Sequence, residues 1–89
     1  MTKIKLAITD DHSLFREGFL SLFNGHEEIE FVSNFDSATD TIQGISKAKV
    51  DILFLDINLP DMQGTQLCKK LKSEFPDLKI IALSSHAEP

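Results

Sequence analysis

The stretch DILFLDINLP, residues 51–60, decides the fold, because it is too apolar for a surface strand and yet ends on a charge. Residues 50–57 are apolar apart from Asp51 and Asp56, which is the pattern of a central strand covered on both faces. Helices are therefore expected on both sides of the sheet. Asp56 closes the strand, so its carboxylate must be solvated there or take part in chemistry.

Strand and helix patterns alternate on either side of this stretch. Apolar residues alternate with polar ones, or form short runs, in three further segments that predict strands at residues 4–9, 28–35 and 78–83. Between the strands they recur every three or four positions, which predicts helices from Ser13 to about Asn24, from Ala38 to about Lys47, and from the Gly64 region to Pro76. This order calls for an α/β fold with a parallel sheet and right-handed crossovers. The polar neighbours of residues 28–35 place that strand at an edge.

Length, charge and cysteine content limit the class of protein. At 89 residues the chain holds one domain with a small core. A net charge of −5 argues against a nucleic-acid or anionic-lipid footprint on this segment. The single cysteine, Cys68, excludes an internal disulfide and fits a reducing compartment. The chain has neither a membrane span nor a signal-peptide layout, so we expect a cytoplasmic protein without membrane contact.

Acidic side chains follow the ends of two predicted strands. Asp10 and Asp11 follow the first strand, Asp56 ends the third, and Ser84 follows the fourth. Ligands of open α/β sheets bind at the carboxyl ends of the strands, so these groups are expected at one rim. Close carboxylates repel unless a cation lies between them, and Mg²⁺ prefers such oxygen ligands. An aspartate beside that ion can attack phosphorus and become an aspartyl-phosphate.

The combined spacing resembles the receiver domain of two-component response regulators, and the resemblance covers residues 1–89. It rests on the three aspartates and on Leu59-Pro60, Gly64 and Ser84 at the matching positions. The segment DDHSLFREGF, residues 10–19, further resembles receivers joined to a helix-turn-helix DNA-binding output domain.

The resemblance implies a flavodoxin-like doubly wound sheet with strand order 2-1-3-4. It implies that Asp56 accepts a phosphoryl group from a sensor histidine kinase, and that Ser84 is the switch hydroxyl. Mg²⁺ would be held by Asp10, Asp11 and Asp56 and by the backbone carbonyl of Asn58. The protein would then be a signalling module that at most catalyses its own phosphorylation, and it would reach DNA only through an output domain outside this sequence.

The chain departs from the family pattern at its end. Receivers carry a further helix, a fifth strand ending in a lysine, and a fifth helix, so residues 1–89 are expected to be a C-terminally truncated receiver. The last lysine, Lys79, lies at the start of the fourth strand and cannot replace the missing one, which puts phosphotransfer in doubt. An open fourth strand and an exposed first-helix stripe would favour self-association.

Two other functions compete with this interpretation. A haloacid-dehalogenase-type phosphatase would place an aspartate two residues after the nucleophile, where this chain has Asn58. A receiver-like interaction module would never accept phosphate, which the intact acidic set argues against. Other residues receive structural interpretations. His12, His26 and His86 are expected at surface or cap positions, because their positions do not form metal-ligand spacing. Phe15, Phe19 and Phe23 are expected in the core, and Cys68 is expected as a small core or boundary residue of the third helix.

Overall fold

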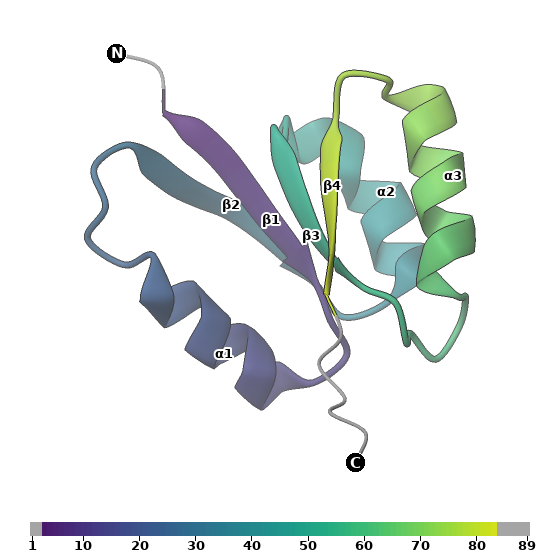
Figure 1. Cartoon of the computed structure of the whole chain (residues 1–89), viewed down its shortest axis with the longest axis horizontal. Coiled ribbons are helices and arrows are strands. Elements are labelled where there is room, and N and C mark those ends of the chain that lie inside the picture. Colours follow the sequence, from purple (N-terminus) through teal and green to yellow (C-terminus); the bar gives the residue numbers. More distant parts are fainter. Residues whose placement is uncertain (1–2, 84–89) are drawn as a thin grey trace.

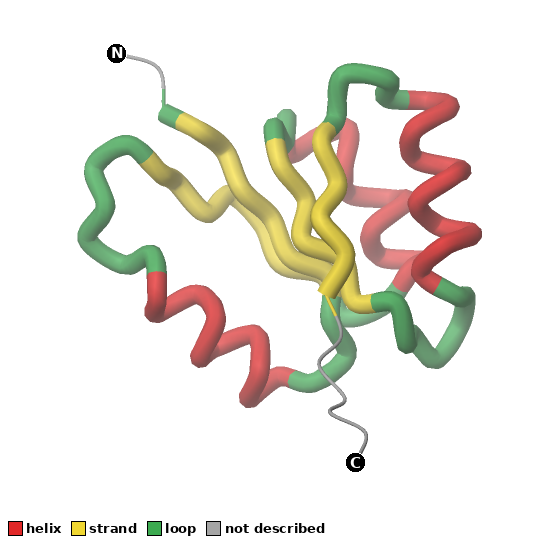
Figure 2. The backbone as a smooth tube through the Cα atoms, in the orientation of Figure 1, coloured by secondary structure: helices red, strands yellow, loops and turns green. Residues whose placement is uncertain are grey.

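The computed structural model describes residues 3–83, which form a four-stranded parallel sheet flanked by helices (Figures 1 and 2). The strands lie in the order β2-β1-β3-β4, and each neighbouring pair is parallel. The predicted α/β class, the 2-1-3-4 order and the edge position of the second strand are therefore confirmed. Along the chain the elements are β1 (Ile4–Thr9), α1 (Ser13–Leu22), β2 (Ile29–Phe35), α2 (Ala38–Ala48), β3 (Ile52–Asp56), α3 (Gly64–Glu74) and β4 (Lys79–Leu83).

The main core lies between the sheet and the pair α2 and α3. Leu53 and Leu55 of β3 are fully buried there, against Leu67 and Leu71 of α3. Each such side chain contributes about 1.5–3 kcal/mol of transfer free energy. Figure 1 shows these two helices together on one face of the sheet, with α1 on the other. Helices on both faces are what the apolar run at residues 50–57 predicts.

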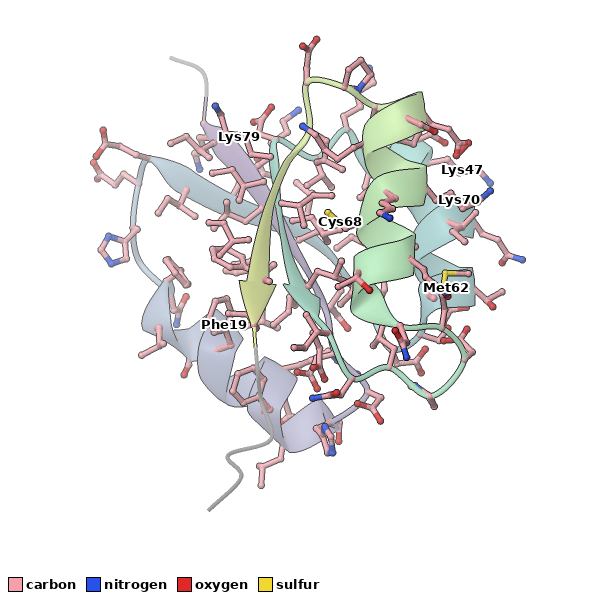
Figure 3. All side chains as sticks on the ribbon, turned by 45° about the vertical axis from the view of Figure 1, so that its right-hand side comes forward. Phe19, Lys47, Met62, Cys68, Lys70 and Lys79 are labelled. Carbon is pink, nitrogen blue, oxygen red and sulfur yellow. The ribbon has the colours of Figure 1, made fainter. Side chains whose placement is uncertain are left out.

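Helix α1 packs on the opposite face of the sheet through aromatic rings. The Phe19 ring centroid lies 4.8 Å from that of Phe54, in an edge-on arrangement, and the Phe23 centroid lies 5.5 Å from that of Phe31. Figure 3 shows Phe19 on the side of α1 that faces the sheet. The predicted aromatic stripe thus does face the sheet.

No residue of α1 is buried, however. The stripe faces the sheet as predicted, but the prediction that its phenylalanines are core residues is wrong. Phe15 is 36% exposed, and the neighbouring apolar residues Leu14 and Leu22 are 82% and 69% exposed. On the same face of the sheet Ile81 is 45% exposed. One helix covers this face incompletely, whereas two helices seal the other.

Strand β2 carries an irregularity that sends its two phenylalanines to different faces. Leu6 pairs with Phe31, but the next residue, Ala7, pairs with Ser33, so Val32 is an extra residue on β2. Such a bulge moves every later side chain to the other face. Phe31 consequently packs on α1, while Phe35 is 7% exposed in the core under α2.

Within residues 3–83, no helix has the length and apolar character needed to cross a membrane.

Candidate metal centre

Three carboxylates and one imidazole meet where β1 and β3 end. The two strands are neighbours with Thr9 paired to Leu55, so the next residues along the chain, Asp10 and Asp56, lie side by side. One potential ligand atom from each of Asp10, Asp11, His12 and Asp56 lies within 4.8 Å of the others. The predicted meeting of the three aspartates at one rim is confirmed.

Two of these carboxylates are held in buried positions by short turns. Asp10 and Asp56 are each 0% exposed. The backbone N–H of His12 donates to Asp10 Oδ1 at 2.7 Å, and the backbone N–H of Asn58 donates to Asp56 Oδ1 at 2.9 Å. A carboxylate that accepts from the amide two residues on stabilises the turn and fixes its own direction. The guanidinium of Arg16 donates to the backbone carbonyl of Asp10, which joins α1 to the same turn.

The donor set fits a hard divalent cation. Asp10 Oδ2 is buried and has no hydrogen-bond partner among the described residues. A buried carboxylate oxygen without a partner costs free energy, and a second buried carboxylate beside it adds repulsion. A cation between them would remove both costs. Carboxylate oxygens at this spacing suit Mg²⁺, which is commonly held by one or two carboxylates and keeps several waters.

His12 lies at the surface, at the N-cap position before α1, as the sequence predicts. Its side chain is 45% exposed and makes no capping hydrogen bond. Its Nδ1 lies 3.2 Å from Asp10 Oδ1 and 3.1 Å from Asp11 Oδ1. The structure therefore adds this imidazole to the acidic cluster, and its direct adjacency to the acidic pair was the sequence signal for that position.

Asn58, Ser84 and Lys79 are further residues that the sequence analysis singled out. Asn58 lies in the turn after β3 and forms an isolated bridge with Gln63, and the role of its carbonyl as a ligand stays a prediction. Ser84 lies outside the described residues. Lys79 begins β4 (Figure 3), at the opposite end of the strand from Leu83, which pairs with Asp56.

The loop after Asp56 is fixed to two other elements. Asp61 reaches the start of α2, where its carboxylate accepts from the backbone N–H groups of Ala38 and Thr39, both at 3.0 Å, and from Thr39 Oγ1 at 2.8 Å. These donors lower the pKa of Asp61 below its ordinary value. Sequence reasoning missed this role because the partners lie more than twenty positions away and no local pattern joins them.

Gly64 anchors the other end of that loop. Its N–H donates to the carbonyl of Ile57 at 3.0 Å, and a Cβ at this position would lie 2.4 Å from Ile57 Cα. Only a residue without a side chain allows α3 to start this close to the end of β3. The loop of residues 57–63 is therefore held at both ends, and its geometry positions Asp56.

Comparison with known proteins identifies related sequences. Residues 6–89 match the family profile described as the response regulator receiver domain. The chain is 33% identical over 84 residues to the transcriptional regulatory protein DegU of Brevibacillus brevis, covering 94% of this chain and 36% of that protein. It is 32% identical over 83 residues to the DNA-binding transcriptional activator DevR/DosR of Mycobacterium tuberculosis, covering 93% and 38%. The chain thus spans less than half the length of these relatives.

Solved structures of similar fold include the isolated REC domain of RcsB from Salmonella enterica serovar Typhimurium, in the presence of the phosphomimetic BeF₃⁻. The TM-score is 0.89 at 27% identity, over 99% of this chain and 66% of that one. The non-phosphorylated receiver domain of RcsB from Escherichia coli gives 0.88 at 28% identity, over 99% and 70%. RcsB from the same Salmonella serovar bound to promoter rprA gives 0.89 at 28% identity, over 97% and 44%.

Proposed function

The chain belongs to the response regulator receiver family and is related to transcriptional regulators, and from this premise we propose that Asp56 accepts a phosphoryl group from a sensor histidine kinase. One observation carries the proposal: Asp10 and Asp56 are fully buried side by side, and Asp10 keeps an oxygen that no described group satisfies. Two buried, adjacent carboxylates lower the stability of the fold when no cation is bound. The same arrangement can bind a cation next to a nucleophile.

The transfer step follows from the position of Asp56. A carboxylate oxygen of Asp56 attacks the phosphorus of a phosphohistidine, forming an oxygen–phosphorus bond while the phosphorus–nitrogen bond breaks. The imidazole nitrogen leaves with the electron pair and gains a proton from solvent. Asp56 is then an acyl phosphate. The backbone amide of Asn58 donates to Asp56 Oδ1 at 2.9 Å and so orients the carboxylate that we assign to the attack.

Mg²⁺ is the cofactor we assign to this site, where it would neutralise charge on the transferring phosphoryl group. Asp10, Asp11 and Asp56 would hold it through carboxylates and Asn58 through its backbone carbonyl. Without the ion, the negative charges of Asp10 and Asp11 would repel the incoming phosphoryl group. Phosphorylation of Asp56 should therefore depend on a divalent cation. We assign the switch hydroxyl to Ser84.

We infer the regulated output from the named relatives. DegU and DevR/DosR are named as transcriptional regulators, and RcsB has been solved bound to promoter rprA. By this relationship we assign the chain to a cytoplasmic regulator whose separate output domain binds DNA. We further propose that copies of this chain associate through the exposed apolar residues of the α1 face, including Leu14, Leu22 and Ile81.

Acceptance of phosphate is tested by incubating the chain with acetyl phosphate and Mg²⁺ and measuring intact mass. We expect stoichiometric gain of one phosphoryl group, sensitive to hydroxylamine and absent from Asp56→Asn. Asp77→Asn is the matched control, since Asp77 is an exposed aspartate in the turn before β4. Equal labelling of Asp56→Asn would refute the assignment, and continuous turnover of p-nitrophenyl phosphate would favour the phosphatase alternative.

Where the chain alone labels poorly, beryllium fluoride with Mg²⁺ provides an equilibrium test. Nuclear magnetic resonance signals of residues around Asp56 should shift in the wild type and stay unchanged in Asp56→Asn. Unchanged wild-type signals would support the phosphate-independent interaction module. Light scattering at tens of micromolar tests the association, and a monomer would contradict it.

A further inference from the structure

We propose that His12 is a nitrogen ligand of the cation site, so that the site binds imidazole-preferring divalent metals such as Co²⁺ more tightly than its oxygen ligands alone would. The inference rests on the cation site of the proposed function, but it concerns which metal is bound and not whether phosphate is accepted. It would make phosphorylation of this chain responsive to the identity of the available metal.

The distances around His12 fit a shared ion. Nδ1 lies 3.1 Å from Asp11 Oδ1 and 3.2 Å from Asp10 Oδ1. Two neighbouring ligands of an octahedral ion, each at about 2.1 Å from the metal, lie about 3 Å apart. The ring nitrogen and the carboxylates therefore already have nearly the separation that a common ion would impose.

The turn places His12 beside the carboxylates. Its backbone N–H donates to Asp10 Oδ1 at 2.7 Å, so the first carboxylate and the backbone of His12 are held together. Asp10 Oδ2, buried and without a partner among residues 3–83, provides an independent sign that a ligand belongs in the cluster. The ring is 45% exposed, so it can turn toward an ion without disturbing the core.

The chemical consequence concerns selectivity. An all-oxygen site suits Mg²⁺, whereas imidazole adds affinity for first-row transition metals and little for Mg²⁺. Removing the ring should therefore lower affinity for one class of metal and leave the other nearly unchanged. A ring that only forms hydrogen bonds to the two carboxylates would change both classes in parallel.

Calorimetric titration of the whole chain with CoCl₂ and with MgCl₂ tests this difference. His12→Ala should weaken Co²⁺ binding about tenfold or more and change Mg²⁺ binding by less than about threefold. His26→Gln is the matched control, because His26 is an exposed histidine beyond the other end of α1, and it should change neither. His12→Asn keeps a hydrogen-bonding group near the carboxylates and should also lose the Co²⁺ preference.

Pulsed electron paramagnetic resonance with Mn²⁺ gives a direct readout that needs no phosphorylation. Wild type should show modulation from a bound imidazole nitrogen, and His12→Ala should lack it. Bound Mn²⁺ without nitrogen modulation, or equal weakening of Co²⁺ and Mg²⁺, would overturn the inference about His12 and leave the phosphoryl function standing. Absence of any divalent binding to wild type would overturn both.

Discussion

Replacing Gly64 by alanine should destabilise the fold and disturb the candidate site at once. The new Cβ would lie 2.4 Å from Ile57 Cα and 2.8 Å from the carbonyl oxygen of Asp56. Both are backbone atoms at the end of β3, so neither can rotate away. Relief therefore requires a shift of the strand end or of the start of α3.

The size of the effect follows from two opposing contributions. Forcing a methyl group into a packed position costs about 1–3 kcal/mol, and a clash with backbone belongs at the upper end. Alanine offsets about 0.5–1 kcal/mol by restricting the unfolded chain, and at a first helical residue the smaller value applies. Gly25 is the glycine with positive φ in the described part of the chain, so Gly64 adds no left-handed strain to this estimate. The net loss should be about 2 kcal/mol.

Two other glycines give matched controls in the same chain. A Cβ at Gly18 would meet no atom within 4 Å, so Gly18→Ala should stabilise the helix by about 0.5–1 kcal/mol. A Cβ at Gly44 would lie 2.6 Å from the ring carbon Cε1 of Phe35, a side chain that can move but is itself buried. Gly44→Ala should therefore fall between the other two variants.

Urea unfolding followed by far-ultraviolet circular dichroism measures all three variants, since the chain has no tryptophan or tyrosine for fluorescence. A loss of about 2 kcal/mol lowers the midpoint by about 1 M urea for a domain of this size. Mg²⁺ affinity should fall only in Gly64→Ala. A midpoint for Gly64→Ala at or above wild type, with Gly18→Ala behaving as expected, would refute the reasoning.

Three further predictions concern charge. Because hydrogen bonds from α2 lower the folded pKa of Asp61, its stabilisation is present above the ordinary aspartate pKa and is lost as pH falls through the lowered value. The urea-midpoint difference between wild type and Asp61→Asn should thus shrink toward acid pH, and a constant difference would contradict this. The pKa of Asp40 is raised because its protonated carboxyl donates a hydrogen bond to Asp36 and because the charge of Asp36 repels the ionised form. Asp36→Asn should therefore raise the urea midpoint at neutral pH and lose that advantage where Asp40 is protonated in both states. Mg²⁺ at one hundred times its dissociation constant should stabilise wild type by about 2.7 kcal/mol, and Asp10→Asn should lose this gain in a thermal melt.

The sequence was sufficient for the fold and for the acidic rim, because each rests on local periodicity. The apolar run ending at Asp56 required a covered central strand, and parallel strands bring Asp10 and Asp56 to the same edge. The extra residue Val32 was not predictable in this way, because a bulge changes the pairing and leaves the local pattern intact. The tie from Asp61 to α2 depends on residues distant in the chain. His12 was predicted as a surface or cap residue and is one, but the approach of its ring to the two aspartates depends on the turn and is not visible in the local pattern.

Because α1 is incompletely buried, its transient detachment from the sheet should affect cation binding by the carboxylates at the ends of β1 and β3. Arg16 of α1 donates to the carbonyl of Asp10, and no side chain of the helix is buried, so the aromatic contacts of Phe19 and Phe23 with the sheet are the main packing that opposes its transient detachment. Detachment of α1 should loosen the turn of residues 10–12, which orients the carboxylate of Asp10. Amide hydrogens of α1 should therefore exchange before those of α3, and a binding partner that clamps α1 to the sheet would tighten ion capture without touching any ligand.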